Sequence, residues 1–126
     1  MKPLTWRDRG ATAVEFALVV PMLMVMLVGI VSFGFAFHVQ TVLDNSARDA
    51  VRVFTLTDID ARDAAILQAQ HSALPTITLP TSAIDAPATC AAEAYVTVTT
   101  RVSDFELLGG LWKVDLIGKG TMRCGG

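Results

Sequence analysis

Glu15 stands at the start of the most apolar part of the chain and needs a chemical reason to be there. The run from Phe16 to Phe37 that follows it holds 22 residues and no Lys, Arg, Asp or Glu. An ionised side chain in bilayer hydrocarbon costs roughly 2.5–3.5 kcal/mol at the centre of a helix and less near its ends. Gly10 lies five residues before Glu15, and the basic residues Lys2, Arg7 and Arg9 precede both. Together they indicate a carboxylate kept for a purpose other than anchoring.

Other residues that could do chemistry are few. His38 and His71 are the two histidines, and neither has a Cys or carboxylate nearby at metal-ligand spacing. The acidic residues at 58, 60 and 63 are typical of the first turn of a helix rather than of a calcium loop. The sequence has no His-Glu-x-x-His motif, phosphate loop or nucleophile elbow, and no basic patch with interleaved aromatics. We therefore expect no enzyme activity, no catalytic, cofactor or metal site, and no nucleic-acid partner.

The uncharged run is long enough to cross a bilayer, because about 20 helical residues span a hydrocarbon core of ~30 Å. It could be a cleaved secretory signal, an uncleaved signal anchor, or the helix that follows a short leader cut at Gly10. The run is longer than the apolar core of a secretory signal, and a plain anchor explains neither Gly10 nor Glu15. We favour the third interpretation, which divides the chain into a leader (1–10), a transmembrane helix (11–37) and a soluble domain (38–126).

Flanking charges predict the orientation of this helix. Lys2, Arg7 and Arg9 precede it, and positive flanks remain in the cytoplasm. The domain after the helix should then lie in the periplasm or beyond, where an oxidising environment favours a disulfide between the two cysteines, Cys90 and Cys124. The alternative is two unpaired structural cysteines.

A family resemblance is carried by Gly10-Ala11-Thr12-Ala13-Val14-Glu15-Phe16, and by Pro21 and Gly29 in the helix that follows. The segment resembles the N-terminus of type IV pilin-like proteins, and more narrowly that of the TadE-like minor pseudopilins of the tight adherence (Tad/Flp) pilus. Residues 47–52 and 118–123 extend the similarity more weakly. The chain departs from the pattern at Ser32, where such proteins often carry a Glu.

The resemblance implies a structural subunit that assembles or primes a pilus. A prepilin peptidase would cut between Gly10 and Ala11, Glu15 and Phe16 would serve subunit assembly, and Pro21 would kink the helix. Glu15 would pair with the new α-amino group of Ala11, in its own subunit or in a neighbour; the alternative is a Glu that reaches back to water without a role. The kink at Pro21 could equally be tolerated without function.

The resemblance also implies the partners and the location of the chain. The partners would be the inner membrane, the peptidase, and other major and minor pilins, including a second Tad pseudopilin. The location would be the bacterial inner membrane, crossed once, or the extracellular pilus. The rival hypothesis is an uncleaved, signal-anchored accessory protein with a periplasmic binding domain.

The expected fold class is α+β: a long helix that continues from the membrane into a small pilin-like domain with a second helix and an antiparallel sheet of two to four strands. Periodicity predicts the first helix over Ala11–Phe54, which would measure roughly 66 Å. A second helix should be capped by Thr57 or Asp58 and run to about Ser72. Its inward residues are expected to be Ile59, Ile66, Leu67 and Leu74.

The C-terminal half predicts extended structure. Prolines mark 75–88 as a loop, with a short edge strand expected at Thr76–Leu79. Alternating residues predict strands at Tyr95–Val102 and Leu111–Ile117. In the first strand Val96, Val98 and Val102 share a face, and in the second Trp112, Val114 and Leu116 do. Gly118 and Gly120 suggest a bulge or kink before Thr121–Cys124. The apolar connection Asp104–Gly110 is expected to tuck under the sheet, the alternative being a partner contact.

Overall fold

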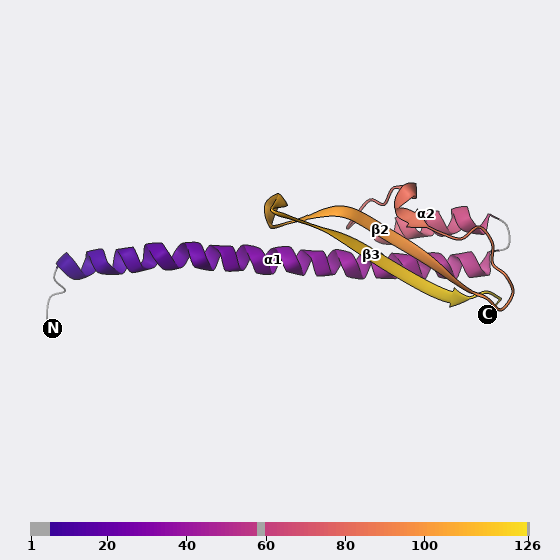
Figure 1. Cartoon of the computed structure of the whole chain (residues 1–126), viewed down its shortest axis with the longest axis horizontal. Coiled ribbons are helices and arrows are strands. Elements are labelled where there is room, and N and C mark those ends of the chain that lie inside the picture. Colours follow the sequence, from indigo (N-terminus) through magenta and orange to yellow (C-terminus); the bar gives the residue numbers. More distant parts are fainter. Residues whose placement is uncertain (1–5, 58–59, 126) are drawn as a thin grey trace.

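One long helix forms the axis of the molecule. The computed structural model describes residues 6–57 and 60–125, with side chains from Gly10 onward. Helix α1 runs from Trp6 to Leu56, 51 residues, or about 76 Å at 1.5 Å per residue. A second helix and a three-stranded antiparallel sheet pack against its C-terminal half, while its N-terminal half extends alone (Figure 1). The expected α+β class is confirmed, and α1 begins earlier and ends later than expected.

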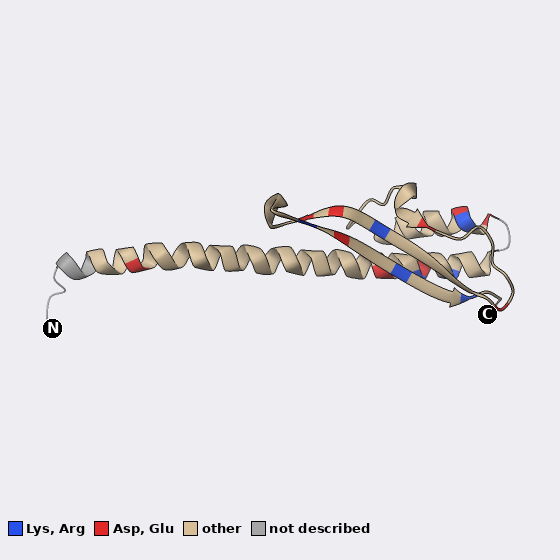
Figure 2. Cartoon of the chain, in the orientation of Figure 1, with Lys and Arg blue, Asp and Glu red and all other residues tan. Residues whose placement is uncertain are grey.

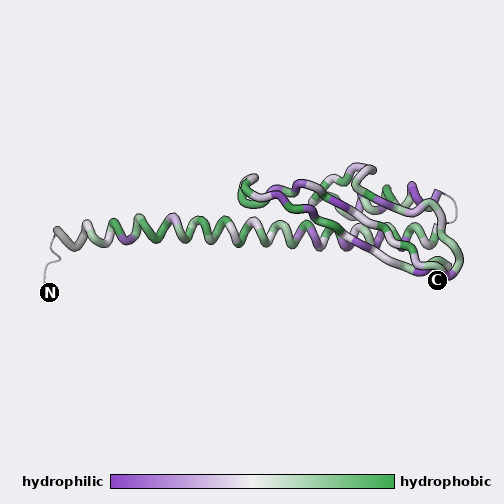
Figure 3. Tube along the Cα trace, in the orientation of Figure 1, coloured by the Kyte–Doolittle hydropathy of each residue, from purple (hydrophilic) through white to green (hydrophobic). Residues whose placement is uncertain are grey.

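The C-terminal half of α1 is held by a buried apolar stripe. Val39, Leu43, Ala47, Ala50 and Phe54 recur every three or four residues, and each is at most 1% exposed. This spacing places them on one helix face, which is the face covered by the rest of the chain. Hydropathy along the trace shows the contrast with the N-terminal half, which is apolar but covered by no other segment that the structure describes (Figure 3).

Helix α2 (Ala61–Ala73) packs on α1 through small residues. Ala65, Ala69 and Ala73 are fully buried at spacing of four, which lets the two helices approach closely. Ser72 donates to Asp49 of α1 at 2.8 Å. This alanine stripe decides which side of the helix turns inward.

Three expectations for this helix need correction. Ile66 is buried as expected, but Leu67 and Leu74 are 65% and 54% exposed, since the alanine stripe faces α1 and Leu67 lies on the opposite side. The helix also begins later than expected, after Asp60, whose side chain caps nothing. The expected residues Asp58 and Ile59 lie outside the described residues.

The sheet has the strand order β1-β2-β3, formed by β1 (Ile84–Asp85), β2 (Tyr95–Leu107) and β3 (Trp112–Arg123). Two short 3₁₀ turns, η1 (Thr81–Ala83) and η2 (Leu108–Gly110), connect these elements. The inward face of β2 is confirmed, with Val96, Val98 and Thr100 buried. Both long strands continue well past their expected ends.

The expected edge strand at Thr76–Leu79 does not form. Leu79 is buried, and its carbonyl accepts a hydrogen bond from Gln70 of α2 at 2.9 Å. This segment is therefore tied to the helix, and the edge strand is instead the short β1, which pairs with Thr99 and Thr100.

The bulge expected at Gly118 and Gly120 was also misplaced. Those glycines pair regularly, Gly118 with Thr100 and Gly120 with Val98. The irregularity lies on β2, between Val102 and Phe105, where Asp104 has a φ of 56°.

The apolar connection Asp104–Gly110 packs against the fold, as expected. Its residues up to Leu107 belong to strand β2. Leu107 is buried, and Phe105 and Leu108 are half-buried. Trp112 was expected on the same face as Val114 and Leu116, yet it is 67% exposed because it lies at the end of the hairpin, beyond the covered part of the sheet.

Candidate functional site

The N-terminal half of α1 is an uncovered apolar surface. From Gly10 to Phe35 every side chain is exposed or half-buried, and the first buried residue after Gly10 is Ala36. Leu18 and Met22, for example, are 73% and 76% exposed. A continuous apolar surface of this size is rare on a soluble monomer and marks a contact with membrane or protein. By length and composition, α1 is the one described helix that could cross a membrane.

Glu15 is the single charged residue on this surface. From Gly10 to Leu43 the sequence has no other Asp, Glu, Lys or Arg, and Figure 2 shows one acidic position isolated in the uncharged helix. Its side chain is exposed. Among the described side chains the ion pairs are Lys113–Asp104 and Arg123–Glu93, and neither includes Glu15. The carboxylate is therefore presented outward, toward whatever covers the helix.

Gly10 and Ala11 lie in the first turns of α1, one turn before Glu15. Four residues separate Ala11 from Glu15, so they share a face about 6 Å apart along the axis. Both Gly10 and Ala11 are exposed, and a Cβ added at Gly10 would meet nothing within 4 Å. The expected cut after Gly10 thus falls at an accessible position, although helical backbone must open locally before a peptidase could bind it.

Two further predicted residues lie on the same surface. Phe16 is 69% exposed, beside Glu15 in sequence. Pro21 lies inside α1, which continues through it without a break (Figure 1). Proline removes one backbone hydrogen bond from the helix, so a local loosening at Pro21 stays a prediction.

The domain is fixed to α1 by strand β3, which runs alongside the helix in the same direction. A Cβ added to Gly118 would overlap the backbone of Leu43, and one added to Gly120 would overlap that of Ala47. Gly118 to Gly120 advances about 7 Å along a strand, and Leu43 to Ala47 advances about 6 Å along a helix. The two glycines therefore follow successive turns of α1 with matched spacing.

Polar side chains of α1 bind the free edge of β3 beside these glycines. Gln40 donates to the carbonyl of Ile117 at 2.8 Å, and Asp44 accepts from the amide of Lys119 at 3.3 Å. The neighbouring strand β2 also contacts the helix, because the buried hydroxyl of Thr100 donates to the carbonyl of Leu43 at 3.0 Å. An unpaired strand edge invites pairing with other chains. Here side chains of α1 form hydrogen bonds with backbone groups on that edge. These bonds fix the position of the sheet along the helix axis.

The predicted disulfide between Cys90 and Cys124 is present, with 5.7 Å between the Cα atoms. It ties the loop before β2 to the residue after β3. The amide of Cys124 also donates to the carbonyl of Ala94 at 2.8 Å, and Cys124 is buried. The bridge closes the end of the sheet farthest from the hairpin turn.

The residues that hold the domain against α1 have only a weak signal in the sequence. Gln40 and Asp44 lie on α1 at spacing of four, and Gly118 and Gly120 at spacing of two on a strand. Two glycines on one face of a strand are a signal of close backbone approach, and that signal was interpreted as a bulge.

The fold and this surface define a chain with one outward-facing apolar helix, long enough to cross a membrane once, and a small α+β domain at its far end. The family model described as TadE-like protein matches residues 10–52, about a third of the chain. The match confirms the resemblance predicted from the sequence and is consistent with a pilin-like protein of the Tad system. No significant match was found among curated proteins or among solved structures.

Proposed function

We propose that the protein is a minor pilin-like subunit, a pseudopilin, that assembles or primes a Tad-type type IV pilus. The observation that carries this proposal is Glu15: one carboxylate, exposed on an uncovered apolar helix, one turn from Ala11. The TadE-like match begins at Gly10, the residue before the proposed cut. A membrane anchor alone gives no reason for an acidic group at this point.

Processing supplies the positive partner for Glu15. A prepilin peptidase cuts after Gly10, removes the basic leader and creates an α-amino group on Ala11, which is largely cationic at neutral pH. A pair of opposite charges at membrane depth costs far less than either charge alone. When the amine belongs to a neighbouring subunit, the ion pair stabilises one particular axial offset between the two helices. That offset sets the register of assembly.

The precursor is inserted with its leader in the bacterial cytoplasm and its domain in the periplasm. Three basic residues in the leader support this orientation. The Cys90–Cys124 disulfide supports an oxidising compartment for the domain. In this arrangement the uncovered helix faces inner-membrane lipid first, and the helices of major pilins or of a second Tad pseudopilin after assembly.

The rival function is an uncleaved membrane-anchored accessory protein, and the structure of the whole chain is compatible with it as well as with an uncut precursor. Helix α1 begins at Trp6 and passes through Gly10 without interruption, as it would in a chain that keeps its leader. In that case the domain would bind a periplasmic partner, and Glu15 would only reach back to water.

Photo-cross-linking in cells that make the pilus tests the proposed role of Glu15. A photoreactive amino acid replaces Leu18, which is 73% exposed one turn beyond Glu15. Adducts with pilin subunits are expected in the otherwise unchanged chain and in the control Glu93→Gln, which removes an exposed carboxylate of the domain. Glu15→Gln should lose most of these adducts while its leader is still removed. Equal adducts in Glu15→Gln and in the control would contradict the proposal.

A further inference from the structure

The turn of the β2–β3 hairpin is apolar, exposed and uncharged. Residues 107–112 read Leu-Leu-Gly-Gly-Leu-Trp. Leu111 is 84% exposed and Trp112 67% exposed, among the highest values for large apolar side chains in the domain. Leu107 is buried and η2 contacts α1, so the turn is held in place against the helix.

This turn lies beside the middle of α1, where the covered part of the helix gives way to its uncovered apolar part (Figure 1). The ring of Phe105 packs on that of Phe35, with 5.9 Å between centroids. Because β3 runs with α1, β2 runs against it, and the chain beyond Phe105 continues toward the N-terminal half of the helix (Figure 1). The three residues from Phe105 to Leu108 extend up to about 10 Å further, at 3.3 Å each.

The depth of the turn can be compared with that of a bilayer. Twenty residues counted from Ala11 reach Ile30 and span about 30 Å, the thickness of the hydrocarbon core. Phe35 then lies about 7 Å beyond the hydrocarbon, and the turn lies below Phe35, at the hydrocarbon boundary. If the hydrocarbon core instead spans Phe16–Phe37, Phe35 lies inside it and the turn lies deeper in the bilayer still. Either placement brings Leu111 and Trp112 to lipid.

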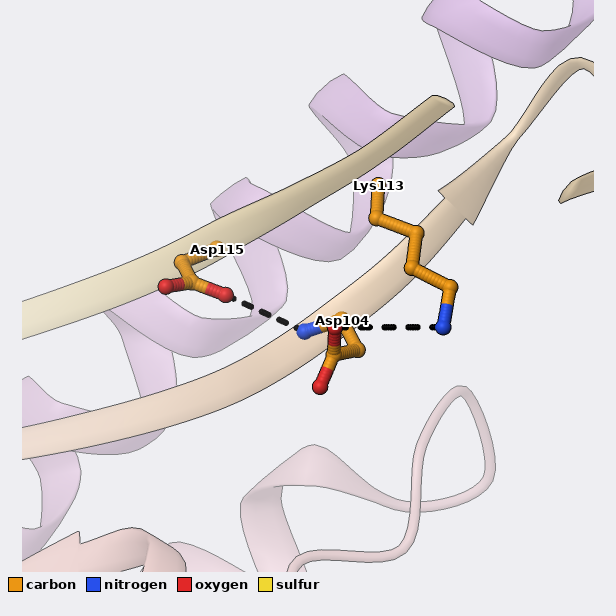
Figure 4. A network of polar contacts seen from close by, with 3 residues as sticks. All are labelled: Asp104, Lys113 and Asp115. Carbon is orange, nitrogen blue, oxygen red and sulfur yellow. Dashed lines mark hydrogen bonds and ion pairs between the residues drawn. The ribbon is translucent and has the colours of Figure 1, made fainter. Parts of the chain in front are cut away.

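Charged residues border the turn, and the carboxylate of Glu106 lies close to Gly110. Glu106 and Lys113 face each other in the strand register. Figure 4 shows the next contacts: Lys113 pairs with Asp104 at 3.9 Å, and the amide of Asp104 donates to Asp115 at 3.1 Å. An apolar tip carrying Trp, bounded by charged groups, is the pattern of a segment that sits at a membrane interface, where Trp is enriched.

We propose that this hairpin turn, Leu108–Trp112, inserts into the boundary between the headgroups and acyl chains of the leaflet from which α1 emerges. The inference rests on the proposed crossing of the membrane by α1 and goes beyond it, since it gives the domain a second lipid contact. Two contacts on one rigid body fix the tilt and rotation of the subunit before assembly.

Tryptophan fluorescence tests this contact in the full chain. The chain has two tryptophans, so Trp6→Phe leaves Trp112 as the single reporter. The protein is reconstituted into vesicles of phosphatidylethanolamine and phosphatidylglycerol that carry a nitroxide on the lipid acyl chain close to the headgroup. Two matched reporters are built in the Trp6→Phe, Trp112→Phe background. Leu23→Trp lies in the apolar half of α1, and Tyr95→Trp lies at the far end of β2, where Tyr95 is 75% exposed.

The expected result is strong quenching of Trp112 by the lipid nitroxide, with a blue-shifted emission and weak quenching by aqueous acrylamide. The Tyr95→Trp reporter should show the reverse, and a nitroxide near the end of the acyl chain should quench Leu23→Trp best. Leu111→Asp should reduce the lipid quenching of Trp112 and leave that of Leu23→Trp unchanged.

The experiment distinguishes failure of the hairpin proposal from failure of the proposed membrane crossing by α1. If Leu23→Trp is quenched by lipid and Trp112 is quenched only by acrylamide, α1 crosses the membrane and the hairpin proposal is wrong. Protection of Trp112 from both quenchers would show a second protein chain covering the turn, which also overturns it. If Leu23→Trp is not quenched by lipid, the membrane crossing itself fails, and the hairpin proposal fails with it.

Discussion

Gly120 of β3 lies against the backbone of Ala47 in α1 with no room for a side chain between them. Gly118 stands in the same relation to Leu43, one helical turn earlier. These contacts are between main chains, so neither partner can move a flexible side chain aside. The domain is therefore fixed at one position along the axis of the long helix. That position determines which part of α1 is left uncovered.

Gly120→Ala should destabilise the domain strongly. Overpacking typically costs about 1–3 kcal/mol, and a clash with backbone should lie at the upper end of that range. Thermal unfolding of the full chain in detergent micelles, followed by near-ultraviolet circular dichroism, measures the loss. Gly34→Ala is the control, because a Cβ there meets nothing within 4 Å. Equal melting temperatures for the two variants would refute the close approach.

Asp44→Ala should expose the amide of Lys119. A hydrogen bond of this kind contributes about 1 kcal/mol, so exchange of the Lys119 amide hydrogen should accelerate by about fivefold. Asp44→Asn is the matched control, because it keeps an oxygen acceptor at the same position. Amide exchange monitored by nuclear magnetic resonance reads the effect residue by residue. Unchanged exchange in Asp44→Ala would remove Asp44 from the role of protecting the strand edge.

Loss of the disulfide should cost a large part of the stability of so small a domain. The bridge joins residues 34 apart in sequence, and in the chain-entropy model a loop of that size corresponds to roughly 3–4 kcal/mol. The double variant Cys90→Ser, Cys124→Ser should unfold at a much lower urea concentration than the oxidised chain. Reduction of the unaltered chain should reproduce the shift, and identical midpoints in all three samples would contradict it.

The sequence predicted the long helix and the inward face of β2 because each has a local signal, and it predicted the disulfide because the chain has only two cysteines. Leu43, Ala47 and Phe54 recur at helical spacing, and Val96 and Val98 alternate at strand spacing. These periods report which face is buried regardless of what covers it.

The errors arose where the covering element decides the outcome. Leu67 is apolar but faces solvent, because Ala65 and Ala69 allow the closer helix contact. Gly118 and Gly120 were interpreted as a bulge because their partner, the backbone of α1, lies more than 70 residues away in sequence. Within the candidate site, the isolation of Glu15 at the start of an uncharged run was visible in the sequence, whereas the apolar hairpin turn beside Phe35 required the fold.

The most direct test of the pilin-like account is the N-terminus of the protein isolated from membranes of cells that make the pilus. Mass spectrometry should find a chain that begins at Ala11, which carries the amine proposed to pair with Glu15. That species should disappear when the prepilin peptidase is deleted or when Gly10 is replaced by Val, while Gly29→Val should leave processing unchanged. An N-terminus still at Met1, or a cut beyond Phe37, would contradict the account, because Glu15 would then lack the partner that explains its position.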